Sequence, residues 1–241
     1  MGKVTEREVT WKGDIESTLG ESVRFALPVY DAMDTEIKRD NRLAYRFFKR
    51  AMDILCSAVA LILLSPLFLI VAIAIKLDSK GPVFFNQTRV GRDEKHFTMY
   101  KFRSMSADAE SRLKDLQGLN ERDGPVFKIH NDPRVTKVGG FIRKTCIDEL
   151  PQLVNIIKGD MSIVGPRPPL PVEVEQYTPY HMGRLRVTQG LTCYWQISKR
   201  DMTFDQWVES DLRYINERGL LLDIKIIFKT VLVVLRQLGA K

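Results

Sequence analysis

LILLSPLFLI, residues Leu61 to Ile70, lies in the middle of the most hydrophobic part of this chain. Its centre is unusual for a helix, because proline lacks a backbone N–H and its ring clashes with the preceding turn. Pro66 therefore leaves the carbonyl of Ile62 without its helical donor, and hydrocarbon offers no water to replace it. The hydroxyl of Ser65 could bond that carbonyl, a known way to relieve such a break. The stretch predicts a helix that is broken or bent at Ser65-Pro66.

The apolar segment around this stretch is long enough to cross a bilayer. No charge occurs in the 22 residues from Ile54 to Ile75, which as one helix would span about 33 Å. One reading is a single-pass anchor with a proline kink. The other is a helix–break–helix that enters one leaflet and returns, and we favour it because both flanks are basic and positive charge tends to stay cytoplasmic. The basic residues are Lys38, Arg39, Arg42, Arg46, Lys49 and Arg50 before the segment, and Lys76 and Lys80 after it.

The flanks and the C-terminal region also have membrane character. KRDNRLAYRFFKRAMD, residues 38–53, alternates cations with aromatic and aliphatic residues, as a helix at the lipid headgroup layer requires. A basic juxtamembrane stop signal would give the same pattern. DIKIIFKTVLVVLRQLGAK, residues 223–241, is apolar with sparse cations. It is too polar to span, so we expect a helix on the membrane surface or in the domain core.

Composition limits the class of protein. The 241 residues, 44% hydrophobic and 28% charged, fit one substantial domain with accessory segments and exclude a disordered tail or a multi-span membrane protein. A net charge of +7 and a pI near 9.3 indicate an anionic partner. Nucleic acid is a poor candidate, since aromatic and basic residues interleave only before the apolar segment. Three cysteines without a CxxC pair argue against a disulfide framework or a zinc site.

The remaining chain predicts a domain of mixed elements. We expect a short strand over 82–85 followed by polar turn residues, and a second strand within 96–105, where apolar and polar residues alternate. Residues 106–123 and 204–218 have helical patterns. Common nucleotide and hydrolase signatures such as GxGxxG, GxxxxGKS/T, HExxH and GxSxG are absent. The three histidines are isolated and give no ligand or base.

Asp148 and Glu149 form an acidic pair at the start of a further predicted helix. Asp148 is a favoured N-cap, Pro151 suits the first turn and Gly159 marks the end. Capping and the helix dipole alone would account for both carboxylates. The same placement also suits chemistry, because a helix N-terminus attracts phosphate and an aspartate can attack phosphorus. Glu149 could ligate Mg²⁺, which prefers carboxylate and phosphate oxygens.

Several cations in rigid or polar settings form a candidate diphosphate site. Arginine offers a planar fork of donors suited to phosphate oxygens. Arg167 stands between prolines, which restrict its backbone and orient its side chain. Each cation alone is equally well explained as a solvated or salt-bridged surface residue, and only the fold could bring them together. The candidates are Arg89, Lys101, Arg103, Arg134, Arg143, Lys144 and Arg167.

In order, these motifs resemble those of the bacterial small monotopic phosphoglycosyl transferases. The matching stretches run from KRAMD through the Ser-Pro break, IKLDSKGPVFFNQTRVG, KFRSM and NDPRVTKVGGFIRKTCIDELPQLVNIIKGDMSIVGPRP to WQISKRDMTFDQWVESDLRYI. They extend from about residue 46 to 234. The resemblance implies a helix-rich α+β, monotopic membrane protein. We expect a cytoplasmic extension over 1–43, a re-entrant helix over 44–77, and a catalytic domain over 78–241 with a small sheet and interfacial helices.

The resemblance also implies a reaction. Such enzymes move a sugar phosphate from a UDP-sugar to undecaprenyl phosphate at the cytoplasmic face of the bacterial membrane and release UMP, as the first membrane step of exopolysaccharide, capsule or O-antigen synthesis. Asp148 would be the nucleophile, with Glu149 near the required Mg²⁺. Arg143 and Arg167 would hold phosphate, and Lys101 and Arg103 match the family's KFR stretch. The expected partners are anionic lipid, a second copy of the chain and downstream glycosyltransferases.

The sequence departs from the family pattern in one region. Gln189 and Cys193 replace the usual proline and glycine before Trp-Gln, and Lys199 replaces the glycine after it. These changes leave the sugar open: glucose or galactose is favoured and an N-acetylhexosamine is possible. A second hypothesis is a membrane-anchored protein that binds phosphorylated glycans or anionic lipid without catalysis. An acidic pair beside phosphate-binding cations argues against it, since binding alone needs no paired carboxylates.

Overall fold

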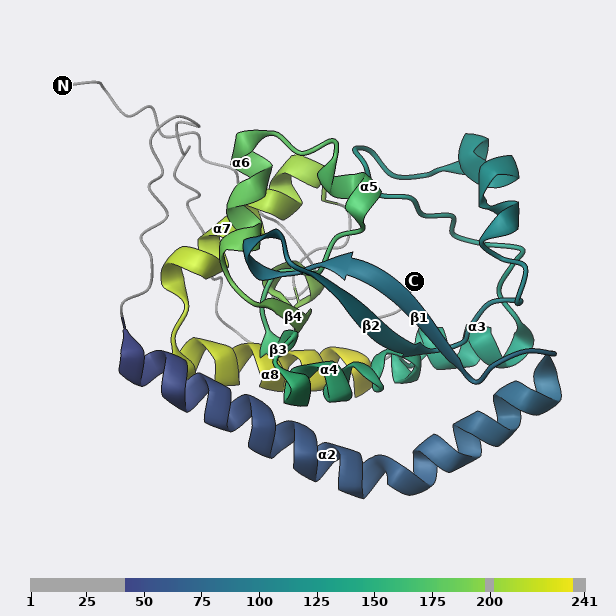
Figure 1. Ribbon diagram of the computed structural model, residues 1–241, viewed down its shortest axis with the longest axis horizontal. Coiled ribbons are helices and arrows are strands. Elements are labelled where there is room, and N and C mark those ends of the chain that lie inside the picture. The colour runs from purple at the N-terminus through teal and green to yellow at the C-terminus, as the bar shows by residue number, and fades with distance from the viewer. Residues whose placement is uncertain (1–41, 198–201, 236–241) are drawn as a thin grey trace, which may run out of the picture. The chain divides into compact units, whose positions relative to one another are not determined.

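The computed structural model describes residues 42–197 and 202–235, so Lys38, Arg39, Lys199 and most of the predicted extension lie outside the described residues. The described residues belong to one compact unit. The fold is a helix-rich α+β fold with two small sheets, as predicted (Figure 1).

The predicted membrane segment is one bent helix, α2 (Leu43–Asp78), which contains Pro66 and curves beneath the other elements (Figure 1). The expected interruption at Ser65-Pro66 is therefore wrong in one respect, because the helix continues through the bend. The Ser65 hydroxyl donates to the carbonyl of Ile62 at 2.8 Å, as predicted, and replaces the donor that proline lacks. Among the described residues, α2 alone is long and apolar enough to cross a membrane, and only 11% of its most apolar window is buried. It has the properties of a membrane-anchoring helix.

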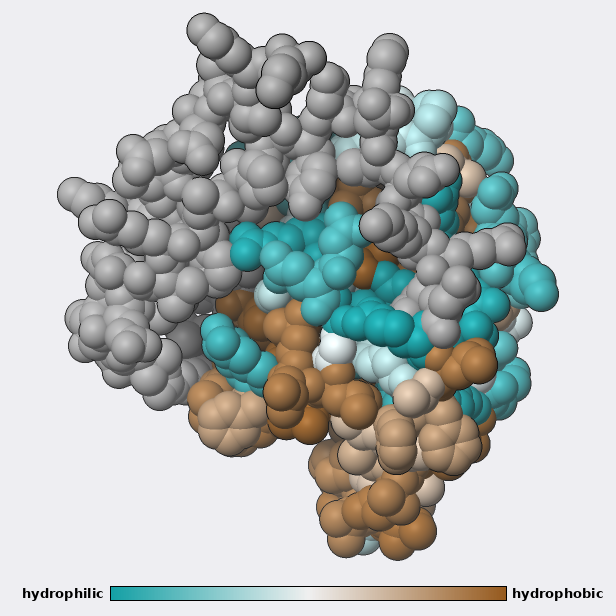
Figure 2. Space-filling model, turned by 90° about the vertical axis from the view of Figure 1, so that its left-hand side faces the viewer, coloured by the Kyte–Doolittle hydropathy of each residue, from teal (hydrophilic) through white to brown (hydrophobic). Residues whose placement is uncertain are grey.

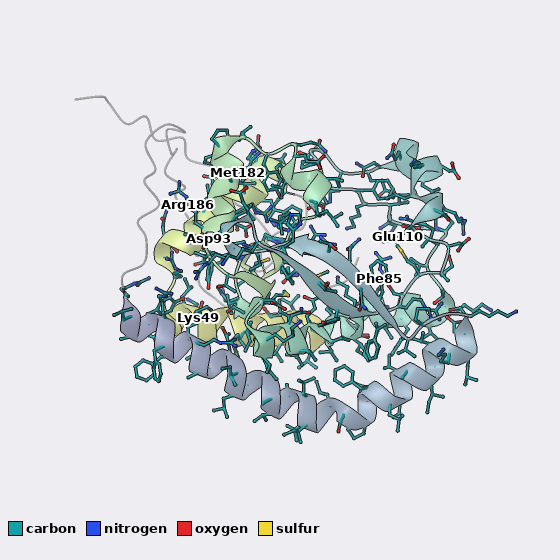
Figure 3. All side chains as sticks on the ribbon, in the orientation of Figure 1. Lys49, Phe85, Asp93, Glu110, Met182 and Arg186 are labelled. Atoms are coloured by element: carbon teal, nitrogen blue, oxygen red, sulfur yellow. The ribbon has the colours of Figure 1, made fainter. Side chains whose placement is uncertain are left out.

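Both halves of α2 pack against the rest of the molecule. In the first half, Arg50 donates to the carbonyl of Ile157 at 2.7 Å, and Asp53 accepts the amide of Ile163 at 3.0 Å. Figure 3 shows Lys49 pointing from α2 toward α8 (Leu220–Leu235), where it pairs with the buried Asp223 at 3.0 Å. The second half contributes Val71 and Ile75 to a core cluster with Phe102 and Ile142.

The domain contains two small sheets. Strands β1 (Phe84–Val90) and β2 (His96–Phe102) form an antiparallel hairpin, and β3 (Met161–Val164) pairs in parallel with β4 (Gln189–Thr192). The second strand was predicted. The first runs five residues further than expected, because the ladder with β2 continues through its polar residues as far as Val90 opposite His96. Arg89 consequently lies in a strand and not in a turn.

The helices follow the predicted pattern with two corrections. The helical stretch after β2 is a 3₁₀ helix, η2 (Ser111–Leu119), and the helix after the acidic pair starts later than predicted, at Gln152. Its end at Gly159 is confirmed, with a left-handed φ of 95° that suits glycine. The remaining bounds are η1 (Arg92–Glu94), α3 (Lys137–Lys144), η3 (Ile147–Glu149), α4 (Gln152–Lys158), α5 (Pro171–Val174), α6 (Pro179–Met182), η4 (Gly183–Arg186), η5 (Tyr194–Ile197) and α7 (Phe204–Glu217).

Apolar side chains are exposed on one layer of helices. Helices α3, α4 and α8 lie above α2 in Figure 1, and α2 contacts each of them. Hydrophobic side chains gather at the lower end of the face in Figure 2, the end at which α2 lies. Such an exposed apolar surface is typical of a region that interacts with a protein or a membrane. It includes Phe47, Phe48, Ile62 and Leu63 of α2, Phe141 of α3, Val154 of α4, and Leu221 and Phe228 of α8.

Candidate active site

The acidic pair lies in η3, a single 3₁₀ turn between α3 and α4. Pro151 occupies the N-cap position of α4, so the prediction that Asp148 caps this helix is wrong. The turn before it is already closed by its own bonds, from the amide of Glu149 to Cys146 O and from that of Leu150 to Ile147 O, each 3.2 Å. A phosphate at Asp148 would therefore depend on side-chain cations and not on these two amides.

Asp148 is the buried member of the pair, with 9% of its surface exposed. Burial raises its pKa to about 6, because removal of water disfavours the charged carboxylate. The positive charges of Lys101 and Arg143 oppose this rise. At pH 7 the carboxylate is mostly ionised, roughly 90% at that pKa, and more basic than an ordinary aspartate.

Glu149 has the opposite shift. Its Oε1 accepts from Lys101 Nζ at 2.7 Å, and about 30% of its side chain is exposed. Burial acts to raise its pKa, but the charge and hydrogen bond of Lys101, with the charges of Arg167 and Arg89, outweigh burial and lower it. Neighbouring carboxylates with divergent pKa values are typical of sites where the two groups have different roles.

Two of the predicted arginines border Glu149. Arg89 is buried, donates to the carbonyl of Pro168 at 3.0 Å and to the Gln87 side chain, and has its pKa lowered to about 9 by burial and by Arg167. It stays charged at neutral pH. Arg167 lies 3.7 Å from Glu173 and stacks 5.6 Å from the ring centre of Trp207. Two guanidinium groups held beside a carboxylate can bind a polyanion.

The proline-rich loop that carries Arg167 is fixed through its carbonyls, since its prolines have no N–H to donate. Each of four consecutive carbonyl groups accepts a bond from another element. Gly190 approaches the loop so closely that a Cβ there would lie 2.1 Å from the nitrogen of Gly165, so glycine is required. The acceptors and donors are Pro166 O with Gly190 N (2.8 Å), Arg167 O with Arg184 (3.5 Å), Pro168 O with Arg89 (3.0 Å) and Pro169 O with Val90 N (2.9 Å).

Arg143 approaches the acidic pair from α3. Its charge lowers the pKa of Asp148, and its Nη1 is buried without a hydrogen-bond partner among the described residues. A buried donor without a partner is costly, and an anionic ligand would remove that cost. Lys101, Arg89, Arg143 and Arg167 thus lie around the pair, and their binding of a diphosphate stays a prediction.

The other two predicted arginines have structural partners. Arg103 donates to the carbonyls of Pro82 (2.6 Å), Lys80 (2.7 Å) and Ser79 (2.9 Å), which ties the end of α2 to β2. Arg134 pairs with Asp132 at 2.6 Å and donates to Ala109 O at 3.1 Å. Their predicted role in substrate binding stays a prediction, and each nitrogen of both guanidinium groups already donates to a protein acceptor.

The sequence analysis did not identify the buried ion pair of Arg184 and Asp211, which lies close to Arg167. Arg184 donates to Asp211, which is fully buried, and to the Tyr177 hydroxyl at 2.9 Å. Trp207 lies between Arg167 and Arg184, 5.6 Å from each guanidinium. The sequence signal that could have found this pair is Asp211, a carboxylate four residues after Trp207 on the buried face of the amphipathic helix α7.

A magnesium ion fits the residues of this site in part. Among the described residues no cluster of three or more histidine, cysteine or acidic side chains could enclose a metal. Mg²⁺ commonly binds through one or two carboxylates together with substrate phosphates, and Asp148 and Glu149 supply such a pair. When bound there with a diphosphate, it would neutralise negative charge on the phosphoryl oxygens.

Comparison with known proteins identifies the family. The family model for bacterial sugar transferases matches residues 44–237. "Galactosyl transferase CpsE" of Streptococcus agalactiae is 47% identical over 80% of this chain and 43% of its own length. "Undecaprenyl-phosphate galactose phosphotransferase" of Salmonella typhimurium is 45% identical over 81% of this chain and 42% of its own length. "Exopolysaccharide production protein ExoY" of Rhizobium meliloti is 42% identical over 76% of this chain and 83% of its own length.

The chain thus spans less than half the length of the first two relatives and most of the third. The matched region contains α2, the acidic pair and all the cations around it. The chain belongs to the bacterial sugar transferase family.

Proposed function

We propose that this protein transfers a hexose-1-phosphate from a UDP-sugar to undecaprenyl phosphate and releases UMP. Undecaprenyl phosphate appears in the name of the Salmonella relative, and exopolysaccharide in that of the Rhizobium one. The observation that carries the proposal is the site itself: a buried carboxylate of raised pKa beside a carboxylate of lowered pKa, inside a group of four cations. The transfer would be the first membrane step in assembling exopolysaccharide, capsule or O-antigen.

The chemistry proceeds in two displacements at one phosphorus. A carboxylate oxygen of Asp148 attacks the phosphorus that carries the sugar, the P–O bond to UMP breaks, and UMP leaves with the electron pair. The resulting phosphosugar–aspartate is then attacked by an oxygen of undecaprenyl phosphate, which breaks the Asp–O–P bond and restores the carboxylate. UMP can leave before the lipid phosphate arrives, so the two bulky substrates need not bind together.

The surrounding residues have separate tasks in this scheme. Lys101 keeps Glu149 ionised and lowers the charge repulsion that two carboxylates present to a diphosphate. Arg143, with its buried Nη1, would bind an oxygen of the phosphoryl group under attack. Arg89 and Arg167 would bind the phosphate of the leaving UMP. Asp148 and Glu149 would hold Mg²⁺, the expected cofactor, which would neutralise negative charge on the diphosphate.

We further propose that α2 is re-entrant and that the protein is monotopic on the cytoplasmic face. Both halves of α2 pack on the same domain, through Arg50 and Asp53 in the first half and Val71 and Ile75 in the second. A straight crossing would pull the second half away from a domain that must stay in water with its nucleotide donor. The exposed apolar side chains of α3, α4 and α8 would lie at the same membrane surface.

The central test uses UDP-sugar without lipid acceptor. Wild-type protein should release one UMP per active site and retain radiolabelled sugar phosphate, whereas Asp148→Asn should do neither. Asp93→Asn is the matched control, because it makes the same change at an exposed position, where the left-handed φ of 53° suits asparagine. Full turnover by Asp148→Asn would refute the covalent mechanism.

A panel of donors distinguishes transferase from binding protein and identifies the sugar. UDP-glucose, UDP-galactose and their N-acetyl forms are each supplied with undecaprenyl phosphate, and UMP is measured. Release with glucose or galactose is expected. Binding of a UDP-sugar without UMP release from any of the four would favour the non-catalytic alternative.

Thiol labelling tests the orientation. Cysteines introduced at Lys38 and Lys80, in a chain whose native cysteines are replaced, should both react with an impermeant reagent only in inside-out vesicles. Labelling of one of them from the periplasmic side would show that α2 crosses the membrane.

A further inference from the structure

Asn155, in α4, makes a two-point bridge to the outer edge of β2. Its Oδ1 accepts the amide of Tyr100 at 3.0 Å, and its Nδ2 donates to the carbonyl of Thr98 at 2.7 Å. A strand presents outward N–H and C=O groups in this spacing to a neighbouring strand, and β2 pairs with β1 on its other side. The Asn155 side chain therefore forms the two hydrogen bonds that a neighbouring strand would form with Tyr100 and Thr98 at this edge.

The bridge has a single possible orientation. The Tyr100 amide can only donate and the Thr98 carbonyl can only accept, so the side-chain oxygen and nitrogen of Asn155 are fixed. The second Nδ2 hydrogen reaches Asp160 at 3.2 Å, and the side chain is fully buried, with 0% exposed. Leu153 and Ile156 of α4 form an apolar cluster with Met99 of β2 and Met161 of β3. Apolar packing alone would allow β2 to slide along α4, whereas two directional bonds do not.

Asn155 joins β2, which contains Lys101, to α4, which follows the η3 turn that contains Glu149. Lys101 directly follows Tyr100 in β2, and Glu149 lies two residues before Pro151, the N-cap of α4. We infer that Asn155 is a positioning residue for the reaction: by fixing the register of β2 against α4, it holds Lys101 Nζ within 2.7 Å of Glu149 beside the nucleophile. This inference rests on the proposed function. A displacement of about 1 Å at such a site can cost two orders of magnitude in rate.

The test is a double-mutant cycle between Asn155→Ala and Lys101→Met, with kcat and KM for the UDP-sugar as readouts. Asn155→Ala should lower kcat about tenfold to a hundredfold, with KM within about twofold. In the Lys101→Met background the same change should cost less than about twofold in kcat, because the group being positioned is already gone. An equal cost in both backgrounds would mean that Asn155 only stabilises the fold, and would overturn the inference.

Lys158→Gln is the matched control. Lys158 also joins α4 to β2, through the Tyr100 hydroxyl at 3.2 Å, but it is half exposed and leaves the bridge intact. Its kcat should stay within about twofold of wild type; a loss as large as that of Asn155→Ala would count against the inference. Asn155→Asp keeps the size of the side chain and the acceptor for Tyr100 but loses the donor to Thr98, so its kcat should lie between wild type and Asn155→Ala.

A measurement on the wild-type protein covers the case in which neither Asn155 variant folds. The Tyr100 amide must exchange with deuterium as slowly as the amides bonded inside the hairpin, and fast exchange would overturn the bridge. The inference and the proposed function fail separately. If Lys101→Met keeps the wild-type kcat, the role of Lys101 is refuted, and with it the inference. If Asp148→Asn keeps full turnover, the covalent mechanism is refuted. Neither result depends on how fast the Tyr100 amide exchanges.

Discussion

On the proposed mechanism, the burial of Asp148 determines the acid limb of the pH–rate profile, that is, the loss of rate at low pH, for the first half-reaction. With a pKa of about 6, the nucleophilic carboxylate falls from roughly 90% of the protein at pH 7 to roughly 10% at pH 5. The sign follows from the chemistry: only the ionised form attacks, so activity is lost as pH falls through about 6. The rate of UMP release in a single turnover should therefore drop about tenfold between pH 7 and pH 5.

Lys101 provides a second test of the same reasoning. Its charge lowers the pKa of Asp148, so Lys101→Met should raise that pKa and move the acid limb to higher pH. The variant should then lose more activity at pH 6 than at pH 8. A lysine that only helped to bind the donor would lower the rate by the same factor at both values.

The assay mixes enzyme with labelled UDP-sugar, without lipid acceptor, at constant ionic strength and Mg²⁺ concentration. Leaving out undecaprenyl phosphate matters, because a phosphate monoester has its own pKa near 6 and would imitate the limb. Tm measured at each pH confirms that the protein stays folded. A single-turnover rate that is flat from pH 5 to pH 8, or a limb that moves to lower pH in Lys101→Met, would refute the argument.

Three further changes test other parts of the structure. Arg103→Gln should lower the free energy of unfolding by about 2–4 kcal/mol, measured by denaturation in detergent, because three carbonyls lose their donor; an unchanged stability would contradict this. Trp207→Leu should raise KM for the UDP-sugar about fivefold through loss of the ring that supports Arg167, with Trp207→Phe restoring most of it; an unchanged KM in folded protein would contradict it. Pro66→Ala should straighten α2, so that a thiol at position 80 becomes partly accessible from the periplasm; full cytoplasmic labelling would show that the bend is not needed.

The elements that local chemistry determines were predictable from the sequence. The hydroxyl of Ser65 bonds the carbonyl freed by Pro66, Gly159 ends α4, and α7 begins where its apolar periodicity begins. Each of these depends on residues within one or two turns of each other. The four cations around the acidic pair were named as candidates one at a time, and only the fold brings Arg89, Lys101 and Arg143 from separate elements to the pair.

The remaining features depend on contacts between distant segments. The N-cap prediction for Asp148 failed because Asp-Glu-Leu-Pro fits either a capped helix or a 3₁₀ turn. The turn formed here is followed by a helix that starts at Gln152, with Pro151 as its N-cap. Arg103 could not be separated from Arg143 by sequence. Only the fold brings the carbonyls of the segment after α2 to Arg103 and leaves Nη1 of Arg143 without a partner among the described residues. The role of Asn155 depends equally on β2, more than fifty residues away.

Helix α4 connects α2 to the acidic pair of the candidate active site. The last carbonyls of α4, at Ile156 and Ile157, accept Arg50 of α2, and the chain just before α4 carries the acidic pair. Helix C-terminal carbonyls have no partners within their own helix, so a guanidinium there satisfies groups that would otherwise need water. On the proposed topology, α2 enters the membrane and α4 lies at its surface, so the contact of Arg50 with α4 helps to set how close the acidic pair lies to the lipid. Arg50→Gln should accordingly slow transfer to the lipid acceptor while single-turnover UMP release stays near wild type, and equal losses in both steps would show that this contact does not set the depth of the site.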